Sequence, residues 1–278
     1  MPSTVEIEPI GDTVGAEVVG ASVDDLLDPA VATRLLDALE RFGVLSFRGV
    51  GLDDATQVAF TRLLGEPVVL PGAAGDHPEI FKVTLDPQKN RAAEYLKSTF
   101  FWHIDGATDD VPTRGTLLTA RDVADEGGDT EFAGTYAAYD ALPEGERAVA
   151  DELRVRHTFE AAQRLMYPNP SEEELAHWRM RPGKEHPLVW RHADGRRSLV
   201  LGATAECVVG MDAAESDAYL ARTLEWATQP QFVYRHHWEV GDLVIWDNRG
   251  TMHRALPYAP TSDRIMHRTT LVGDEAIS

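Results

Sequence analysis

The sequence predicts an α+β fold in which helices wrap an antiparallel β core. Apolar runs of strand length, separated by turn residues, gather in the second half of the chain, whereas most of the helical periodicity lies in the first half. The chain also contains no glycine-rich phosphate loop, which argues against a doubly wound parallel sheet. Its 278 residues fit one large domain or two small ones, and we expect a single domain over residues 1–278.

Short strands and helices are expected to alternate at the start of the chain. Residues 6–19 hold β-like runs interrupted by glycine. Residues 29–42 have the spacing of an amphipathic helix that begins after Asp28, a residue type suited to the N-cap, and ends before a glycine. Residues 44–47 form a short apolar strand. A second helix, at 53–64, has apolar residues at helical spacing.

The stretch from Leu70 to Thr99 lacks periodicity and is rich in glycine, proline and charge. We interpret it as a long loop region with one strand at 80–84, and loops of this length in compact domains are usually functional. The other expected strands are 113–120, 186–189, 198–201, 231–234, 242–246 and 265–272, and the other expected helices are 142–155, 171–178 and 212–228.

Composition and charge exclude several classes of function. The net charge of -20 disfavours a nucleic-acid partner, since phosphate backbones are repelled. No apolar run is long enough to cross a membrane, and the N-terminus does not have the pattern of a signal peptide. Cys207 is the only cysteine, which fits a cytoplasmic location and is most simply a small buried apolar residue. The sequence leaves homo-oligomer formation open.

A candidate metal site centres on the segment Phe100–Gly106. His103 and Asp105 are two residues apart, so on a strand they would present an imidazole and a carboxylate to the same point. One further histidine would complete the facial triad that holds non-haem Fe(II) and leaves three positions open. On its own, a His-x-Asp pair is weak support for a metal site.

Two arginines near the C-terminal end of the chain suggest an anion site. On a strand, Arg264, Met266 and Arg268 share a face, and a buried guanidinium needs an anionic partner. Arginine suits a carboxylate because it can contact both oxygens in one plane. At about 3.3 Å per residue the two arginines would be about 13 Å apart, too far to share one carboxylate. Surface arginines on an edge strand are the alternative.

These segments resemble the TauD/TfdA family of Fe(II)/2-oxoglutarate dioxygenases, and the resemblance covers most of the chain. It is carried by the His103–Asp105 pair, the run 127–132, the run 246–249 with His253, and the segment 264–268. Residues 135–143 and 227–243 are most similar to the 2,4-dichlorophenoxyacetate dioxygenase branch. Taurine-using members carry a histidine where this chain has residues 67–70, so a sulfonate such as taurine is not the expected substrate. The phenoxyacetate members lack the run 100–102, so their substrate does not carry over either.

The resemblance implies a double-stranded β-helix (jelly-roll) core and a reaction of 2-oxoglutarate and O₂ that oxidises a small substrate and releases succinate and CO₂. It assigns the Fe(II) to His103, Asp105 and His253, and the distal carboxylate of 2-oxoglutarate to Arg264 with help from Thr130. Arg268 corresponds to an arginine that binds the anionic group of the substrate in several members. We therefore expect a carboxylate-bearing substrate. Hydroxylation, ether or ester cleavage and desaturation remain open as outcomes.

Other residues have weaker claims to the site. His77, in the long loop, and Lys97, just before the metal motif, are candidate substrate contacts, with solvent-facing roles as the alternative. His236 and His237 would point to opposite faces of a strand, so at most one could reach a metal. His267 lies on the strand face opposite Arg264 and is interpreted as structural.

Two further classes of function compete with the oxygenase. One is a non-catalytic jelly roll that binds a small carboxylate as a sensor, which would have little reason to keep both the triad and Arg264. The other is a zinc hydrolase that uses the same three ligands, because Zn²⁺ also accepts two histidines and a carboxylate. Such a hydrolase would need a general base beside the metal and would have no need for an arginine that binds 2-oxoglutarate.

Overall fold

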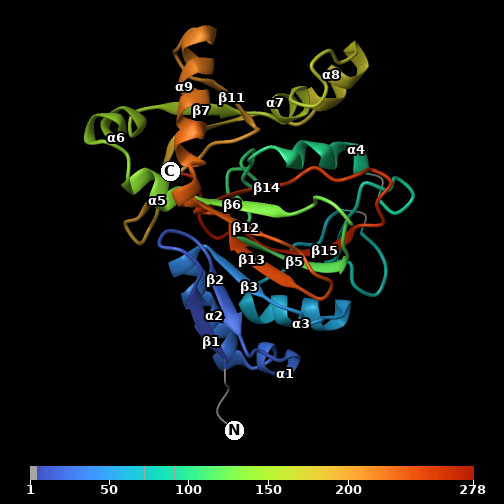
Figure 1. The fold of residues 1–278 in the computed structure, drawn as a ribbon. Helices are drawn as coiled ribbons and strands as arrows, with labels where there is room; N and C mark the ends of the chain where they lie inside the picture. The colour runs from blue at the N-terminus through green and yellow to red at the C-terminus, as the bar shows by residue number, and fades with distance from the viewer. Residues whose placement is uncertain (1–4, 72, 91) are drawn as a thin grey trace.

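Two facing sheets occupy the centre of the structure, a computed structural model that describes residues 5–71, 73–90 and 92–278 (Figure 1). The larger sheet has the strand order β1-β2-β3-β13-β5-β15-β4, and the smaller has the order β12-β6-β14. Every pairing in them is antiparallel except that of β2 with β3. The expected α+β jelly-roll core with surrounding helices is therefore confirmed. Residues 1–4, on which the signal-peptide prediction partly rests, lie outside the described residues.

The strands of the larger sheet come from both ends of the chain. They are β1 (Glu6–Pro9), β2 (Ala16–Val19), β3 (Val44–Phe47), β4 (Phe81–Val83), β5 (Gly115–Asp122), β13 (Leu243–Asp247) and β15 (Ile265–Leu271). The smaller sheet contains β6 (Thr130–Gly134), β12 (Val233–His236) and β14 (Thr251–Ala255). One peripheral sheet contains β7 (Arg154–His157), β8 (Lys184–Pro187) and β11 (Ala205–Val208). Another contains β9 (Val189–Arg191) and β10 (Arg197–Leu199).

Helices cover the outer face of the larger sheet and the far end of the smaller one (Figure 1). The α-helices are α1 (Val23–Leu26), α2 (Pro29–Phe42), α3 (Asp54–Leu64), α4 (Ala93–Leu96), α5 (Thr135–Asp140), α6 (Glu144–Ala150), α7 (Phe159–Arg164), α8 (Glu172–Arg179) and α9 (Ala213–Ala227). Two 3₁₀ helices, η1 (Lys97–Phe100) and η2 (Pro230–Phe232), complete the set. Within the described part of the chain, no helix has the length and apolar character that a membrane span requires.

The core between the two sheets positions the candidate site. Phe132 of β6 and Trp246 of β13 pack across the gap with their ring centroids 5.4 Å apart. Residues of β3, β5, β12 and β15 complete this cluster, including Val44, Leu118, Tyr234 and Met266. A second cluster seals α1, α2 and α3 against the outer face of the larger sheet, and a third surrounds α5 and α9. The strand ends beside the central cluster are therefore held rigidly on both sides.

Helix α2 shows how local sequence determines where a helix begins and which of its faces is buried. The Asp28 side chain accepts a hydrogen bond from the Ala30 N–H, and Pro29 occupies the first turn, where its missing N–H has no cost. Val31, Leu35 and Leu39 recur at helical spacing and are buried in the cluster under the larger sheet. The predicted bounds of this helix and of β3 are confirmed.

The prediction of one helix over residues 142–155 is wrong. Only α6 is helical, and the chain then turns into β7, in which Val155 and His157 alternate with exposed residues and are buried between β8 and β11. The long loop does contain β4 as expected, but also α4 and η1, which were not predicted. Strands β6 and β14 were not predicted either, although they carry Thr130 and His253.

His236, the last residue of β12, and the adjacent His237 do face opposite ways. His236 is fully buried, with its Nε2 3.0 Å from the Asp242 carboxylate, whereas the His237 side chain is 72% exposed and pairs with Asp129. Cys207 is half-buried rather than buried, and it lies at a register irregularity in the pairing of β11 with β7. Burial raises the pKa of its thiol.

Candidate active site

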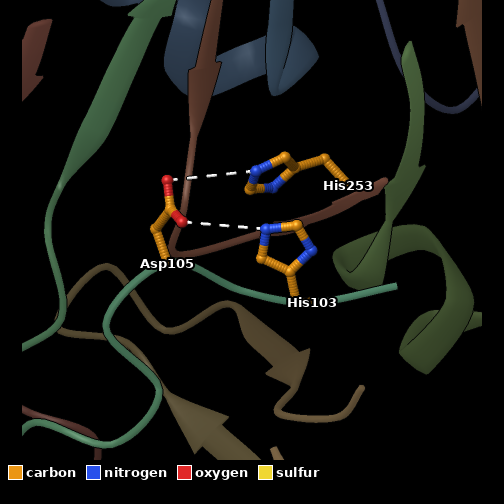
Figure 2. A group of neighbouring side chains, drawn as sticks. All are labelled: His103, Asp105 and His253. Carbon is orange, nitrogen blue, oxygen red and sulfur yellow. Dashed lines mark ion pairs between the residues drawn. The ribbon is translucent and has the colours of Figure 1, made fainter. Parts of the chain in front are cut away.

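Three side chains from two distant segments converge at one end of the space between the sheets (Figure 2). Each of His103, Asp105 and His253 offers one ligand atom, and these atoms all lie within 4.8 Å of one another. Nε2 of His103 is 3.8 Å from Asp105 Oδ1, and Nε2 of His253 is 3.9 Å from Asp105 Oδ2. The two imidazole rings lie side by side, with their centroids 4.1 Å apart.

A reciprocal pair of backbone hydrogen bonds sets the separation of the two histidines. The His103 N–H donates to the His253 carbonyl at 3.0 Å, and the His253 N–H donates to the His103 carbonyl at 2.9 Å. Strand alternation, which would place His103 and Asp105 on one face, is not what joins them, because His103 forms only an isolated bridge and Asp105 lies in the turn that follows. Tertiary contacts, rather than strand alternation, bring the carboxylate to the histidines.

Gly202 allows a third segment to lie against this bridge. Its φ of +107° is a conformation that side chains other than glycine rarely adopt, and a Cβ there would lie 2.4 Å from the Trp102 carbonyl oxygen. The next residue, Ala203, donates its N–H to that same carbonyl at 2.7 Å. The segment that carries His103 is therefore held by β14 on one side and by residues 202–203 on the other.

The protonation states of the three groups suit metal binding. His103 Nδ1 lies 2.9 Å from the Phe101 carbonyl, to which it can only donate, so in the neutral ring Nε2 is the nitrogen with the lone pair. Burial among the Phe132 and Trp246 rings lowers the pKa of His253 well below its ordinary value. Burial opposes ionisation of Asp105 as well, but the Arg268 guanidinium, followed by His253 and His103 in their protonated forms, lowers its pKa to about 2. Two neutral imidazoles and a carboxylate are the ligand set of the Fe(II) facial triad.

Arg264 is a buried cation immediately before β15. It is 2% exposed, its Nη2 donates to the Gly128 carbonyl at 3.1 Å, and its guanidinium lies 4.8 Å from the centre of the Tyr258 ring. No carboxylate of the described residues forms an ion pair with it, although burial of an unpaired guanidinium is costly. Burial also lowers the pKa of Arg264. A Cβ at Gly128 would lie 3.0 Å from Arg264 Nε, so glycine leaves the space that this side chain occupies.

Thr130 lies two residues beyond Gly128, on β6. Its hydroxyl oxygen accepts a hydrogen bond from the Trp238 indole N–H at 2.9 Å, and the residue is 3% exposed. Because the indole can only donate, the hydroxyl proton of Thr130 remains available for an acceptor.

Arg268 borders a small cavity beside the triad, with a volume of about 160 Å³. Its Nη1 is 3.7 Å from Asp105 Oδ2, which is too long for a hydrogen bond, and its buried Nε has no partner among the described residues. The guanidinium lies 4.9 Å from the centre of the Phe81 ring. Arg264 immediately precedes β15, and an irregularity between Ile265 and Met266 interrupts the pairing of that strand with β5, so the separation of about 13 Å from Arg264 stays a prediction.

The structure does not bring His77 or Lys97 into this group. Lys97 pairs with Glu94 at 2.9 Å, and His77 interacts with Asp53 at the N-terminus of α3. Neither residue lines the cavity beside the triad. His267 pairs with Asp54 at 2.6 Å, in keeping with its structural interpretation.

Two neighbours of the site were not singled out from the sequence. Phe81 lines the cavity under Arg268, and the Thr116 hydroxyl donates to Asp105 Oδ2 at 3.2 Å. Phe81 lies in a strand that was predicted within the long loop, which is a usable signal. Thr116 is one of two threonines on β5, and nothing in the sequence distinguishes it from Thr119.

Comparison with known proteins places these residues in context. Residues 6–270 match the family described as taurine catabolism dioxygenase TauD, TfdA family. The chain is 32% identical to an (S)-phenoxypropionate/alpha-ketoglutarate-dioxygenase of Sphingobium herbicidovorans, over 99% of this chain and 98% of that protein. It is 35% identical to an alpha-ketoglutarate-dependent 2,4-dichlorophenoxyacetate dioxygenase of Burkholderia sp., over 92% of this chain and 91% of that one. The crystal structure of AAD-2 with Mn(II) and N-oxalylglycine aligns with a TM-score of 0.84 at 31% identity, covering 99% of this chain and 100% of that one.

Proposed function

Because this chain belongs to the TauD/TfdA family and is an Fe(II)- and 2-oxoglutarate-dependent dioxygenase, we propose that His103, Asp105 and His253 bind its iron. The chemistry of this donor set fits that ion, and three protein ligands leave three positions for 2-oxoglutarate and O₂. When bound, the iron activates O₂ and couples substrate oxidation to the conversion of 2-oxoglutarate into succinate and CO₂. The chain itself binds and orients the reactants and excludes water.

The observation that carries this proposal is the buried guanidinium of Arg264, which has no carboxylate partner among the described residues. The distal carboxylate of 2-oxoglutarate would supply the missing anion through a charge-assisted, two-pronged contact. The free hydroxyl proton of Thr130 would donate to the same carboxylate. A zinc hydrolase built on the same triad would have no use for this arginine, so Arg264 favours the oxygenase over that alternative.

We assign the substrate anion to Arg268. Its guanidinium borders the cavity beside the triad, forms no hydrogen bond with the described residues and has only the 3.7 Å ion pair with Asp105, so its remaining N–H groups can bind a substrate carboxylate there. The two relatives compared above are named for phenoxypropionate and 2,4-dichlorophenoxyacetate, both of which are carboxylates. Val68, Leu70 and Phe81 give the cavity an apolar wall, whereas Glu79, Asp105 and Asp109 are the acidic residues of its lining. A small substrate would therefore place its carboxylate on Arg268 and a compact apolar body against that wall, with its oxidisable C–H directed toward the triad.

The domain organisation, cellular location and partners are proposed from features of the whole chain. We propose that residues 1–278 form one domain, since the strands of the larger sheet come from both ends of the chain. A cytoplasmic location fits the single cysteine, and the net charge of -20 disfavours nucleic acid as a partner. Homo-oligomer formation is left to measurement.

A substrate panel tests the proposal. Small carboxylates, matched uncharged amides and sulfonates are incubated with Fe(II), 2-oxoglutarate and O₂, and succinate release is measured together with product mass. We expect carboxylates to stimulate succinate release and to gain one oxygen atom, with cleavage products where the new hydroxyl sits beside an ether oxygen. Equal stimulation by the amides would refute the role of Arg268. Turnover supported by Zn(II) without 2-oxoglutarate would favour the hydrolase.

A further inference from the structure

A buried series of hydrogen bonds joins the core of the larger sheet to Asp105. The Trp246 indole N–H donates to Asn248 Oδ1 at 3.0 Å, and Asn248 Nδ2 donates to the Thr116 hydroxyl at 3.2 Å. The Thr116 hydroxyl in turn donates to Asp105 Oδ2 at 3.2 Å. Asn248 Nδ2 also donates to the Thr113 hydroxyl at 3.0 Å. The Thr113 hydroxyl in turn lies 3.5 Å from the Asp105 backbone carbonyl. Trp246, Asn248 and Thr116 are each at most 2% exposed.

The direction of every bond in this series follows from its first member. An indole N–H can only donate, so the side-chain oxygen of Asn248 must face Trp246 and the amide NH₂ must face the threonines. Once Thr116 accepts from that amide, its own proton is free for Asp105, whose carboxylate can only accept. The polarity of the series, from Trp246 toward Asp105, is therefore fixed.

The sheet holds the donors of this series rigidly. Trp246 on β13 and Thr116 on β5 are directly paired across the two strands, and Asn248 follows the end of β13. Asp105, by contrast, lies in a turn outside any strand. Its carboxylate thus takes its orientation from side chains of the sheet rather than from its own backbone.

The two carboxylate oxygens of Asp105 consequently have different surroundings. Each oxygen lies near one histidine, since Oδ2 is 3.9 Å from His253 Nε2, but only Oδ2 accepts a hydrogen bond from Thr116 and lies 3.7 Å from the Arg268 guanidinium. Oδ1 has no hydrogen-bond donor among the described residues and lies 3.8 Å from His103 Nε2. We infer that Asn248 and Thr116 are positioning residues that occupy Oδ2 and so leave Oδ1 as the oxygen that binds the metal. This inference rests on the proposed triad, and it assigns to Asn248 a role in metal affinity although it touches neither metal nor substrate.

Mn(II) binding to the purified apo protein tests this inference without turnover. The Mn(II) dissociation constant is measured by titration calorimetry for wild type, Thr116→Val, Thr116→Ser and Thr119→Val. Thr119→Val is the matched control, because Thr119 is a buried threonine on the same strand whose hydroxyl donates to Gln57 at 2.8 Å. We expect Thr116→Val to raise the dissociation constant roughly ten- to hundredfold relative to this control, as loss of a partner of a metal ligand commonly does. Thr116→Ser, which keeps the hydroxyl, should stay within about threefold of wild type.

A second variant tests the direction of the series, and it also covers the case in which Thr116→Val fails to fold. Asn248→Asp has nearly the same shape but can only accept, so the Thr116 proton turns toward the new carboxylate and leaves Asp105 Oδ2 without a donor. Weaker Mn(II) binding with an apo Tm close to that of the Thr119→Val protein supports the inference. Wild-type affinity in Thr116→Val, or in Asn248→Asp, overturns it. If wild type itself binds no Mn(II), the triad proposal fails instead, so the two failures are distinguishable.

Discussion

Replacing Arg264 with alanine should weaken 2-oxoglutarate binding strongly. The guanidinium is 2% exposed and has no carboxylate partner among the described residues, so an incoming carboxylate would meet it away from water. Loss of one partner from a buried, charge-assisted pair costs about 2 to 4 kcal/mol. At about 1.4 kcal/mol for each factor of ten, the dissociation constant should rise roughly 30- to 700-fold. Arg264→Lys should recover only part of this, because an ammonium group cannot make the planar two-pronged contact.

The assay is calorimetric titration of 2-oxoglutarate into Mn(II)-loaded protein, which separates binding from turnover. Arg121→Ala is the matched control, since Arg121 lies on β5 of the same sheet but pairs with Asp54 at 2.8 Å. This control should bind 2-oxoglutarate as wild type does. The reasoning is refuted if Arg264→Ala retains wild-type affinity, or if Arg121→Ala loses as much affinity as Arg264→Ala.

Three further predictions follow from the site and its surroundings. His103→Ala and Asp105→Ala should each abolish Mn(II) binding and turnover with little change in the apo Tm, and turnover in either variant would contradict the triad. Arg268→Ala should keep the slow, substrate-independent consumption of 2-oxoglutarate while losing its stimulation by a carboxylate substrate, which oxygen uptake measures. Burial opposes ionisation of Asp242, but hydrogen bonds from His236 and two backbone N–H groups lower its pKa from 3.8 to about 2. The unfolded chain then binds the proton more readily, so the free energy of unfolding should fall as the pH drops from about 5 to 2, with a shallower fall in Asp242→Asn by urea denaturation.

Local signals in the sequence predicted some elements closely. Helix α2 begins at a capping aspartate followed by proline and ends before a glycine, and all three signals act within a few residues. The Lys97–Glu94 pair could also have been predicted, because the two residues are three apart on a helical segment. A lysine with such a neighbour is a weak candidate for a substrate contact.

Long-range contacts decided the features that the sequence did not predict. Residues 142–155 contain enough apolar residues for a helix, but pairing with β8 and β11 makes the last of them a strand. His103 and Asp105 were identified as neighbours on a strand, whereas they meet through the backbone bridge to His253 and through Thr116. Neither contact produces a recognisable local sequence pattern, because His253 lies 150 residues after His103 and Thr116 lies 11 residues after Asp105.

The backbone bridge between His103 and His253 has a consequence for how the enzyme acquires its metal. A chain emerging from the ribosome has at most two of the three proposed ligands until β14 has been synthesised, and both arginines come later still. Metal-binding sites rarely exist before folding, so each competing cation meets a site whose geometry is already set. Divalent metals differ in intrinsic affinity, with Cu²⁺ and Zn²⁺ above Fe²⁺, so loading with iron depends on geometry and on which ions the cell makes available at that moment.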